Sequence, residues 1–209
     1  MNYIVSGLER SGTSLMMQIL EKANFPLIYD DKRKPDQHNP KGYYEVSKGL
    51  IINNLFNNRF NPNTYKGKFV KITSYGLQYL PKAKYKILYM TRDIYEVWKS
   101  QERMIRINSM KVSVSDEKMR DILRKMNEEA ISYINDRDDI EYLIVSYNNL
   151  MSNPKEELQK ISDFLNFDVS LGYEVIDYNL YRSKGKSKTE LSEEEREIIE
   201  ERLKELGYM

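Results

Sequence analysis

A glycine-rich loop near the start of the chain constrains the fold more than any other feature. It lies between a short apolar run at residues 2–6 and a stretch at 13–23 whose apolar residues recur at helical spacing. The order strand, glycine loop, helix is typical of α/β proteins that bind anions at the carboxyl end of a parallel strand. The sequence therefore predicts a mainly parallel sheet with an anion site close to residues 7–14.

This loop departs from the usual nucleotide-phosphate pattern, G-x-x-x-x-G-K-S/T, at its lysine. Gly7 and Gly12 have the expected spacing, but Thr13 and Ser14 follow directly, and Arg10 is the cation inside the loop. We expect backbone N–H groups to face an anion, with hydroxyls from Thr13 and Ser14 that also cap the helix. The missing lysine argues against an ATPase or GTPase, because that lysine holds the β- and γ-phosphates. A turn that binds no ligand is the alternative.

Strand and helix patterns alternate along the rest of the chain. Strands are predicted at 25–31, 68–73, 85–91 and 140–147, the last of them buried. Helices are predicted at 43–56, 93–106, 115–136, 153–167 and 192–209. Ser115, Asn153 and Ser192 are the predicted N-caps. We predict a single domain over residues 1–209, with three layers and a central parallel sheet flanked by helices.

Composition excludes several kinds of site. The chain has no cysteine and one histidine, His38, so thiol chemistry and a multi-histidine zinc site are excluded. A net charge of +1 gives no reason to expect bulk attraction to nucleic acid or membrane. No apolar run approaches the roughly 18 residues that a membrane helix needs. We expect a cytoplasmic protein without a nucleic-acid or membrane partner and without a required metal.

Two further segments strengthen the interpretation of the loop. In "ILYMTRDIYEVWKSQ", Arg92 follows an apolar strand and Ser100 follows eight residues later. With "SGLERSGTSLM" and "YNNLMSNPKEELQKISDFLNF", this segment resembles, in family order, three motifs of the sulfotransferases that use 3′-phosphoadenosine 5′-phosphosulfate (PAPS). The resemblance covers most of residues 3–166. It implies a P-loop-like fold and PAPS as the sulfonate donor.

The resemblance also implies a place for each end of PAPS. The 5′-phosphosulfate would be held by the glycine loop, through Gly7, Glu9, Arg10, Ser11, Gly12, Thr13 and Ser14. Arg92 would pair with the 3′-phosphate, Ser100 would add a hydroxyl, and Tyr147 would lie beside the adenine. Arg182 and Lys184 resemble part of a basic C-terminal segment that closes over the cofactor. A solvated basic loop is the alternative for these two residues.

The catalytic base is where the chain departs from the cytosolic members of the family. Lys71 resembles their lysine near the transferred sulfonate, but Thr73 stands where they have histidine. Glu45, expected at the start of a helix, is the first candidate base. His38 is the second and Asp36 the third. We expect Arg10 and Lys71 to neutralise the sulfonate and the leaving phosphate.

Together these features predict a PAPS-dependent sulfotransferase acting on a hydroxyl or amine of a small-molecule or carbohydrate acceptor. A P-loop small-molecule kinase, which would bind Mg-ATP, remains an alternative. So does a non-catalytic nucleotide-binding protein, which the Thr73 substitution would suit. The loops at 30–45, 57–67 and 108–115 are expected to shape the acceptor pocket.

Overall fold

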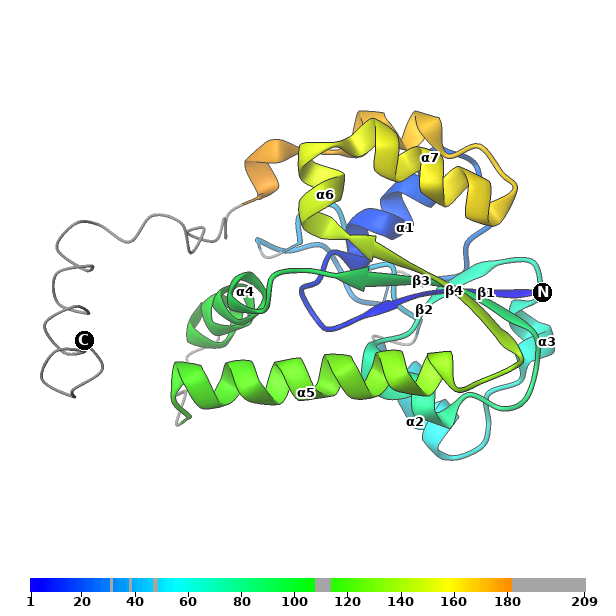
Figure 1. The fold of residues 1–209 in the computed structure, drawn as a ribbon, viewed down its shortest axis with the longest axis horizontal. Coiled ribbons are helices and arrows are strands. Elements are labelled where there is room, and N and C mark those ends of the chain that lie inside the picture. The colour runs from blue at the N-terminus through cyan, green and yellow to red at the C-terminus, as the bar shows by residue number, and fades with distance from the viewer. Residues whose placement is uncertain (31, 38, 47–48, 108–113, 182–209) are drawn as a thin grey trace, which may run out of the picture.

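A sheet of parallel strands forms the centre of the computed structural model, with helices on both faces (Figure 1). The structure describes residues 1–181 except 31, 38, 47–48 and 108–113. The strands are β1 (Asn2–Gly7), β2 (Phe69–Lys71), β3 (Tyr85–Thr91) and β4 (Ile140–Ser146), in the order β2-β1-β3-β4. Every pairing is parallel, which confirms the predicted α/β sheet.

The parallel register brings distant parts of the sequence to one edge of the sheet. Gly7 pairs with Met90, and Thr91 pairs with Ser146, so β1, β3 and β4 end side by side. On the other side of β1, Val5 pairs with Lys71 at the end of β2. Whatever follows each strand therefore meets at this carboxyl edge, where parallel α/β sheets bind ligands.

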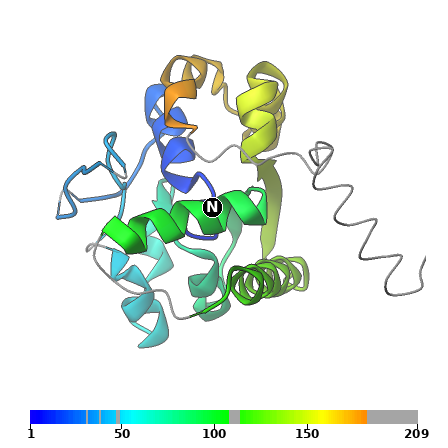
Figure 2. The same cartoon turned by 90° about the vertical axis from the view of Figure 1, so that its left-hand side faces the viewer.

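Helices cover the two faces and the carboxyl edge of the sheet. The helices are α1 (Thr13–Lys22), α2 (Ile51–Phe56), α3 (Pro62–Tyr65), α4 (Ile94–Ile107), α5 (Asp116–Asn135), α6 (Tyr147–Ser152) and α7 (Pro154–Leu165). Helices α1, α6 and α7 lie on one face, and α2 and α5 on the other (Figure 1). Figure 2 views the carboxyl edge, with α4 crossing in front of the sheet. In the described part of the chain, no helix is long and apolar enough to cross a membrane.

The two faces of the sheet bury two separate hydrophobic clusters. In β1, Val5 packs toward α1 and Ile4 toward the opposite cluster, because successive side chains of a strand alternate between faces. Leu88 and Ile87 in β3 divide in the same way. Both faces are covered, so the central strands are continuous apolar runs rather than alternating ones.

One strand prediction was wrong, and another was right in its position but wrong in its burial. Residues 25–30 form no strand, and among them Leu27 alone makes a bridge, to Phe69 in β2. Pro26 within this run has no N–H to donate to a ladder. The run at 140–147 is a strand but not a buried one, because β4 lies at the edge of the sheet and leaves Glu141 and Ile144 exposed.

Helix starts were predicted correctly where a capping residue lies within a few positions of the first turn. Ser115 caps α5 by accepting a hydrogen bond from the backbone N–H of Lys118. The helix predicted at 43–56 begins only at Ile51, since Tyr44 adopts a left-handed backbone with φ 54°. Asn153 makes no side-chain cap, and the separate short helix α6 precedes it. The helix predicted at 192–209 lies outside the described residues.

Candidate functional site

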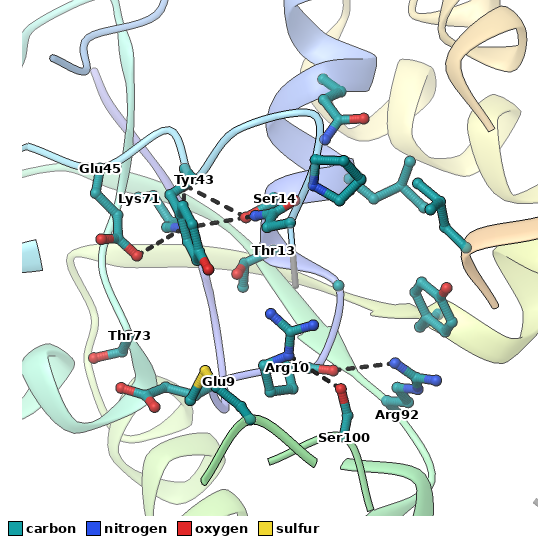
Figure 3. Close-up of a pocket in the computed structure, with 18 of the residues that line it drawn as sticks. Glu9, Arg10, Thr13, Ser14, Tyr43, Glu45, Lys71, Thr73, Arg92 and Ser100 are labelled. Atoms are coloured by element: carbon teal, nitrogen blue, oxygen red, sulfur yellow. Dashed lines mark hydrogen bonds and ion pairs between the residues drawn. The ribbon is translucent and has the colours of Figure 1, made fainter. Parts of the chain in front are cut away.

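A pocket opens at the carboxyl edge, between the glycine loop, the segment at 33–45, the ends of β2 and β3, and α4 (Figure 3). Ten of the predicted site residues line it: Glu9, Arg10, Gly12, Thr13, Ser14, Glu45, Lys71, Arg92, Ser100 and Tyr147. Gly7 and Ser11 are buried behind this lining. His38, Arg182 and Lys184 lie outside the described residues.

The glycines of the loop allow the protein to pack closely against itself. Gly7 has φ 145°, and a Cβ there would lie 2.4 Å from the carbonyl oxygen of Met90 in β3. Gly12 has φ 105°, and its Cβ would lie 2.5 Å from Cδ2 of Tyr147. Gly12 is also the N-cap of α1, without a side-chain cap. The prediction that Thr13 and Ser14 cap the helix was wrong, because both already belong to its first turn.

Arg10 joins the glycine loop to α4. Its Nε donates to Oγ of Ser100 at 3.1 Å, and its carbonyl oxygen accepts from Nη1 of Arg92 at 3.3 Å. Burial lowers the pKa of Arg10, the charges of Arg92 and Arg33 lower it further, and Tyr43 and Asp36 oppose the shift. A bound anion would relieve this crowding of cations, so the electrostatics favour an anionic ligand beside Arg10.

Arg92 lies beside the glycine loop, next to the carbonyl oxygen of Arg10, and is held on several sides. Its Nε donates to Oε2 of Glu96 at 2.9 Å, and its guanidinium carbon lies 4.3 Å from the ring centroid of Tyr147. The ring of Tyr181 is 5.4 Å away on another side. The side chain is only 9% exposed, so this cation has a fixed direction at the pocket surface.

Lys71, at the end of β2, supplies a cation that the sequence of the loop lacks. Its Nζ lies 3.3 Å from Oγ of Ser14 and 3.2 Å from Oε1 of Glu45, and it also donates to the carbonyl oxygen of Tyr43 (Figure 3). Burial lowers the pKa of Lys71, and the charge of Glu45 opposes that shift. The ammonium therefore lies against the glycine loop in a largely water-free position.

Glu45 lies in an extended loop and not at a helix start, so that part of its prediction was wrong. Its Oε1 accepts from Lys71, and Nη1 of Arg33 lies 3.2 Å and 3.0 Å from its two oxygens. Thr73, in the position where the cytosolic enzymes have histidine, also lines the pocket. A carboxylate has about four acceptor sites, so one remains beyond the contacts from Lys71 and Arg33.

Sequence reasoning missed the residues that fold the 33–45 segment onto the loop. The guanidinium carbon of Arg33 lies 3.5 Å from the ring centroid of Tyr43, whose hydroxyl donates to both carboxylate oxygens of Asp36. Burial, followed by the hydrogen bond to Asp36, raises the pKa of Tyr43. Asn39 donates to Oγ of Ser14 at 3.0 Å. The only sequence signal was the concentration of polar residues in this loop.

Of the three loops expected to shape the pocket, the one at 30–45 contributes several wall residues. The loop at 57–67 contributes none to the wall that the structure describes, and it contains the short helix α3 at the other end of the sheet. Residues 108–113 of the third loop lie outside the described residues. Among the described residues, Val175, Asp177 and Leu180, which follow α7, also line the wall.

The charges of the pocket suit a ligand with two anionic ends. Cations outnumber acids along its wall, with Arg10, Arg33, Lys71, Arg92 and Arg103 against Glu9, Glu45 and Asp177. Lys71 lies against Ser14 after the glycine loop, and Arg92 lies against the carbonyl oxygen of Arg10 within it. Within the described residues, no three His, Cys, Asp or Glu side chains are grouped so that they could hold a metal ion.

Comparison with known proteins places the chain in a family. The family model for the sulfotransferase domain matches residues 2–205. The solved sulfotransferase domain from the curacin biosynthetic pathway is 12% identical, with 96% of each chain covered and a TM-score of 0.47. Retinol dehydratase in complex with androsterone and the inactive cofactor PAP is 14% identical, with 97% of this chain and 79% of that one covered and a TM-score of 0.49. No curated protein matches the chain. Because the family model spans nearly the whole chain, the protein belongs to the sulfotransferase family.

Proposed function

We propose that the protein transfers a sulfonate group from PAPS to a hydroxyl or amine of a small-molecule or carbohydrate acceptor. The observation that carries this proposal is the convergence of Arg10, Lys71 and Arg92 on one pocket, with Glu45 beside Lys71. Each of the three cations follows or ends a different strand. The pocket thus combines two anion-binding ends with a carboxylate that can accept a proton.

The residues of the chain divide between the two ends of the cofactor. When bound, PAPS supplies a sulfonate that is activated because its leaving group is a phosphate. The backbone N–H groups of the glycine loop, with Arg10 and Ser14, would hold the 5′ end. Arg92 and Ser100 would hold the 3′-phosphate, and Tyr147, which borders this end, would lie beside the adenine. These cations are fixed before any ligand arrives, so little reorganisation is needed on binding.

Lys71 and Glu45 would act where the acceptor meets the sulfonate. The ammonium of Lys71 would offset negative charge that develops on sulfonate and leaving-group oxygens. Glu45 would orient the acceptor hydroxyl or amine and take its proton. Nη1 of Arg33 lies within hydrogen-bond distance of both carboxylate oxygens of Glu45, and the acceptor would use an acceptor site of the carboxylate that remains.

Conversion of PAPS to PAP tests the proposal directly. The protein would be incubated with PAPS and a panel of phenols, sugars, aliphatic alcohols and amines, and both PAP and the sulfated product would be measured. Acceptor-dependent product supports a sulfotransferase. PAP binding without a product on any acceptor would favour the non-catalytic alternative.

Thermal stability separates the remaining alternative, a small-molecule kinase. A ligand at about 100 times its dissociation constant stabilises a fold by roughly 2.7 kcal/mol, which is several degrees in Tm. We expect a shift of this size with PAP and a much smaller one with Mg-ATP. A shift with Mg-ATP alone would overturn the PAPS assignment.

A further inference from the structure

A buried carboxylate lies behind Arg92, outside the pocket wall. Glu96, in the first turn of α4, is 3% exposed. Its Oε2 accepts from Nε of Arg92, and its Oε1 accepts from the hydroxyl of Tyr181 at 2.8 Å and from Nδ2 of Asn148 at 3.3 Å. The Asn148 amide is itself oriented, because its oxygen accepts from the backbone N–H of Asp93. Both oxygens of Glu96 are therefore committed to donors from separate segments.

The contacts of Arg92 show what this arrangement fixes. An arginine side chain is long and flexible, and its use in bidentate binding depends on the direction of its planar fork. Glu96 holds Nε, the carbonyl of Arg10 holds Nη1, and the ring of Tyr147 lies against the guanidinium face. The orientation of the fork is thus determined by the protein, and Arg92 lines the pocket.

We propose that Glu96 is the positioning residue of this end of the site: it holds Arg92 in the direction that recognises a phosphate monoester, here the 3′-phosphate. The inference rests on the proposed cofactor. It assigns to Glu96 the discrimination between nucleotides with and without a 3′-phosphate. Without Glu96, Arg92 would be a nearly buried cation with no counter-ion and would turn toward another partner.

Repulsion between Glu96 and the bound phosphate is the opposing effect. The donors from Tyr181 and Asn148 reduce it, because their positive ends partly neutralise the charge on Oε1, the oxygen that accepts from them. The two effects predict opposite signs when the charge is removed. Lost orientation weakens binding of the 3′-phosphate, and lost repulsion strengthens it.

Calorimetric affinities for PAP and for AMP, which lacks the 3′-phosphate, test this proposal. We expect Glu96→Gln to lower the affinity for PAP about tenfold and to change the affinity for AMP less than twofold. The tenfold figure is the lower end of the loss of affinity observed when the hydrogen-bond partner of a metal-binding side chain is removed. Glu102→Gln is the matched control. Glu102 lies on the same helix, is 9% exposed and accepts from an arginine four residues on, Arg106, yet it does not line the pocket. It should leave both affinities unchanged.

A second variant keeps the test valid if Glu96→Gln fails to fold. Tyr181→Phe removes one hydrogen-bond donor to Glu96. It should lower the affinity for PAP about two- to threefold and leave the affinity for AMP unchanged. Equal losses for PAP and AMP, or tighter PAP binding, would overturn the positioning role. The wild-type protein tests the cofactor separately, because a failure to prefer PAP over AMP would overturn the proposed function and this inference with it.

Discussion

Gly12→Ala tests how closely the glycine loop is packed against the aromatic ring beneath it. The new methyl carbon would lie 2.5 Å from Cδ2 and 3.2 Å from Cε2 of Tyr147. The backbone has φ 105°, which a residue with a side chain adopts at a cost of about 1–2 kcal/mol. Forcing a methyl group into a filled position adds about 1–3 kcal/mol. We therefore expect a loss of about 2–5 kcal/mol in the free energy of unfolding.

Gly67→Ala separates the two contributions. Gly67 also has a left-handed backbone, with φ 76°, but no atom lies within 4 Å of its added Cβ. We expect this control to lose only the backbone cost, about 1–2 kcal/mol. Urea unfolding of the two variants and the wild type gives the comparison, with m-values checked for equality. Each kcal/mol should also lower Tm by about 2–4 °C in a chain of this size.

The difference between the two variants carries the conclusion. If Gly12→Ala costs no more than Gly67→Ala, the ring of Tyr147 moves aside freely and is not held between the loop and Arg92. The reasoning about a fixed Arg92 would then fail as well, because the same ring lies against its guanidinium. A clear excess for Gly12→Ala would show that the loop and the ring are packed as one unit.

Two further predictions concern the acceptor side of the pocket. Glu45→Gln should lower turnover at least about a hundredfold, measured by product formation, while calorimetry should show unchanged affinity for PAP. Glu21→Gln is the control, because the Glu21 carboxylate accepts from Tyr29 and Tyr44 away from the pocket, and it should leave turnover unchanged. Normal turnover of the Glu45→Gln variant would show that the base is another residue. The pKa of Lys71 is lowered by burial, so the unfolded chain binds its proton more strongly and the folded wild type gains stability as the pH rises toward 10.5. The difference in unfolding free energy between wild type and Lys71→Met should therefore grow in favour of wild type from neutral pH to pH 10, and a flat difference would contradict the burial of a charged lysine.

The parts of the site that the sequence predicted are those built from local signals. The strand, loop and helix around Gly12 follow from apolar spacing and two glycines, and the parallel order of the strands then brings Lys71 and Arg92 to the same edge. The roles of these residues remain predictions, but their meeting in one pocket needed only the fold. Ser115 was predictable as a cap because capping involves residues three positions apart.

The parts that could not be predicted depend on contacts between irregular segments. Arg33 and Tyr43 lie in a loop with left-handed turns, where no periodicity indicates which way a side chain points. Glu96 has the sequence pattern of an acid favoured by the positive end of a helix. The local sequence does not indicate that Glu96 is buried and accepts from Tyr181, which is 85 residues away. Glu45 lines the pocket, but the helix on which it was expected does not form there, and its role as the base stays a prediction.

The hydrogen bonds that tie Arg10 to Arg92 and Ser100 also bear on how the site appears during folding. They join residues 82 and 90 positions apart, so each closes a long loop of chain. Closing such a loop costs conformational entropy before the new contacts stabilise the chain. Neither hydrogen bond can form until β1 has paired with β3. A partly folded chain without this pairing lacks the contacts that hold Arg92 and Ser100 beside Arg10. The arrangement of these three residues should therefore appear only together with the native sheet, and no folding intermediate that lacks the β1–β3 pairing should contain it.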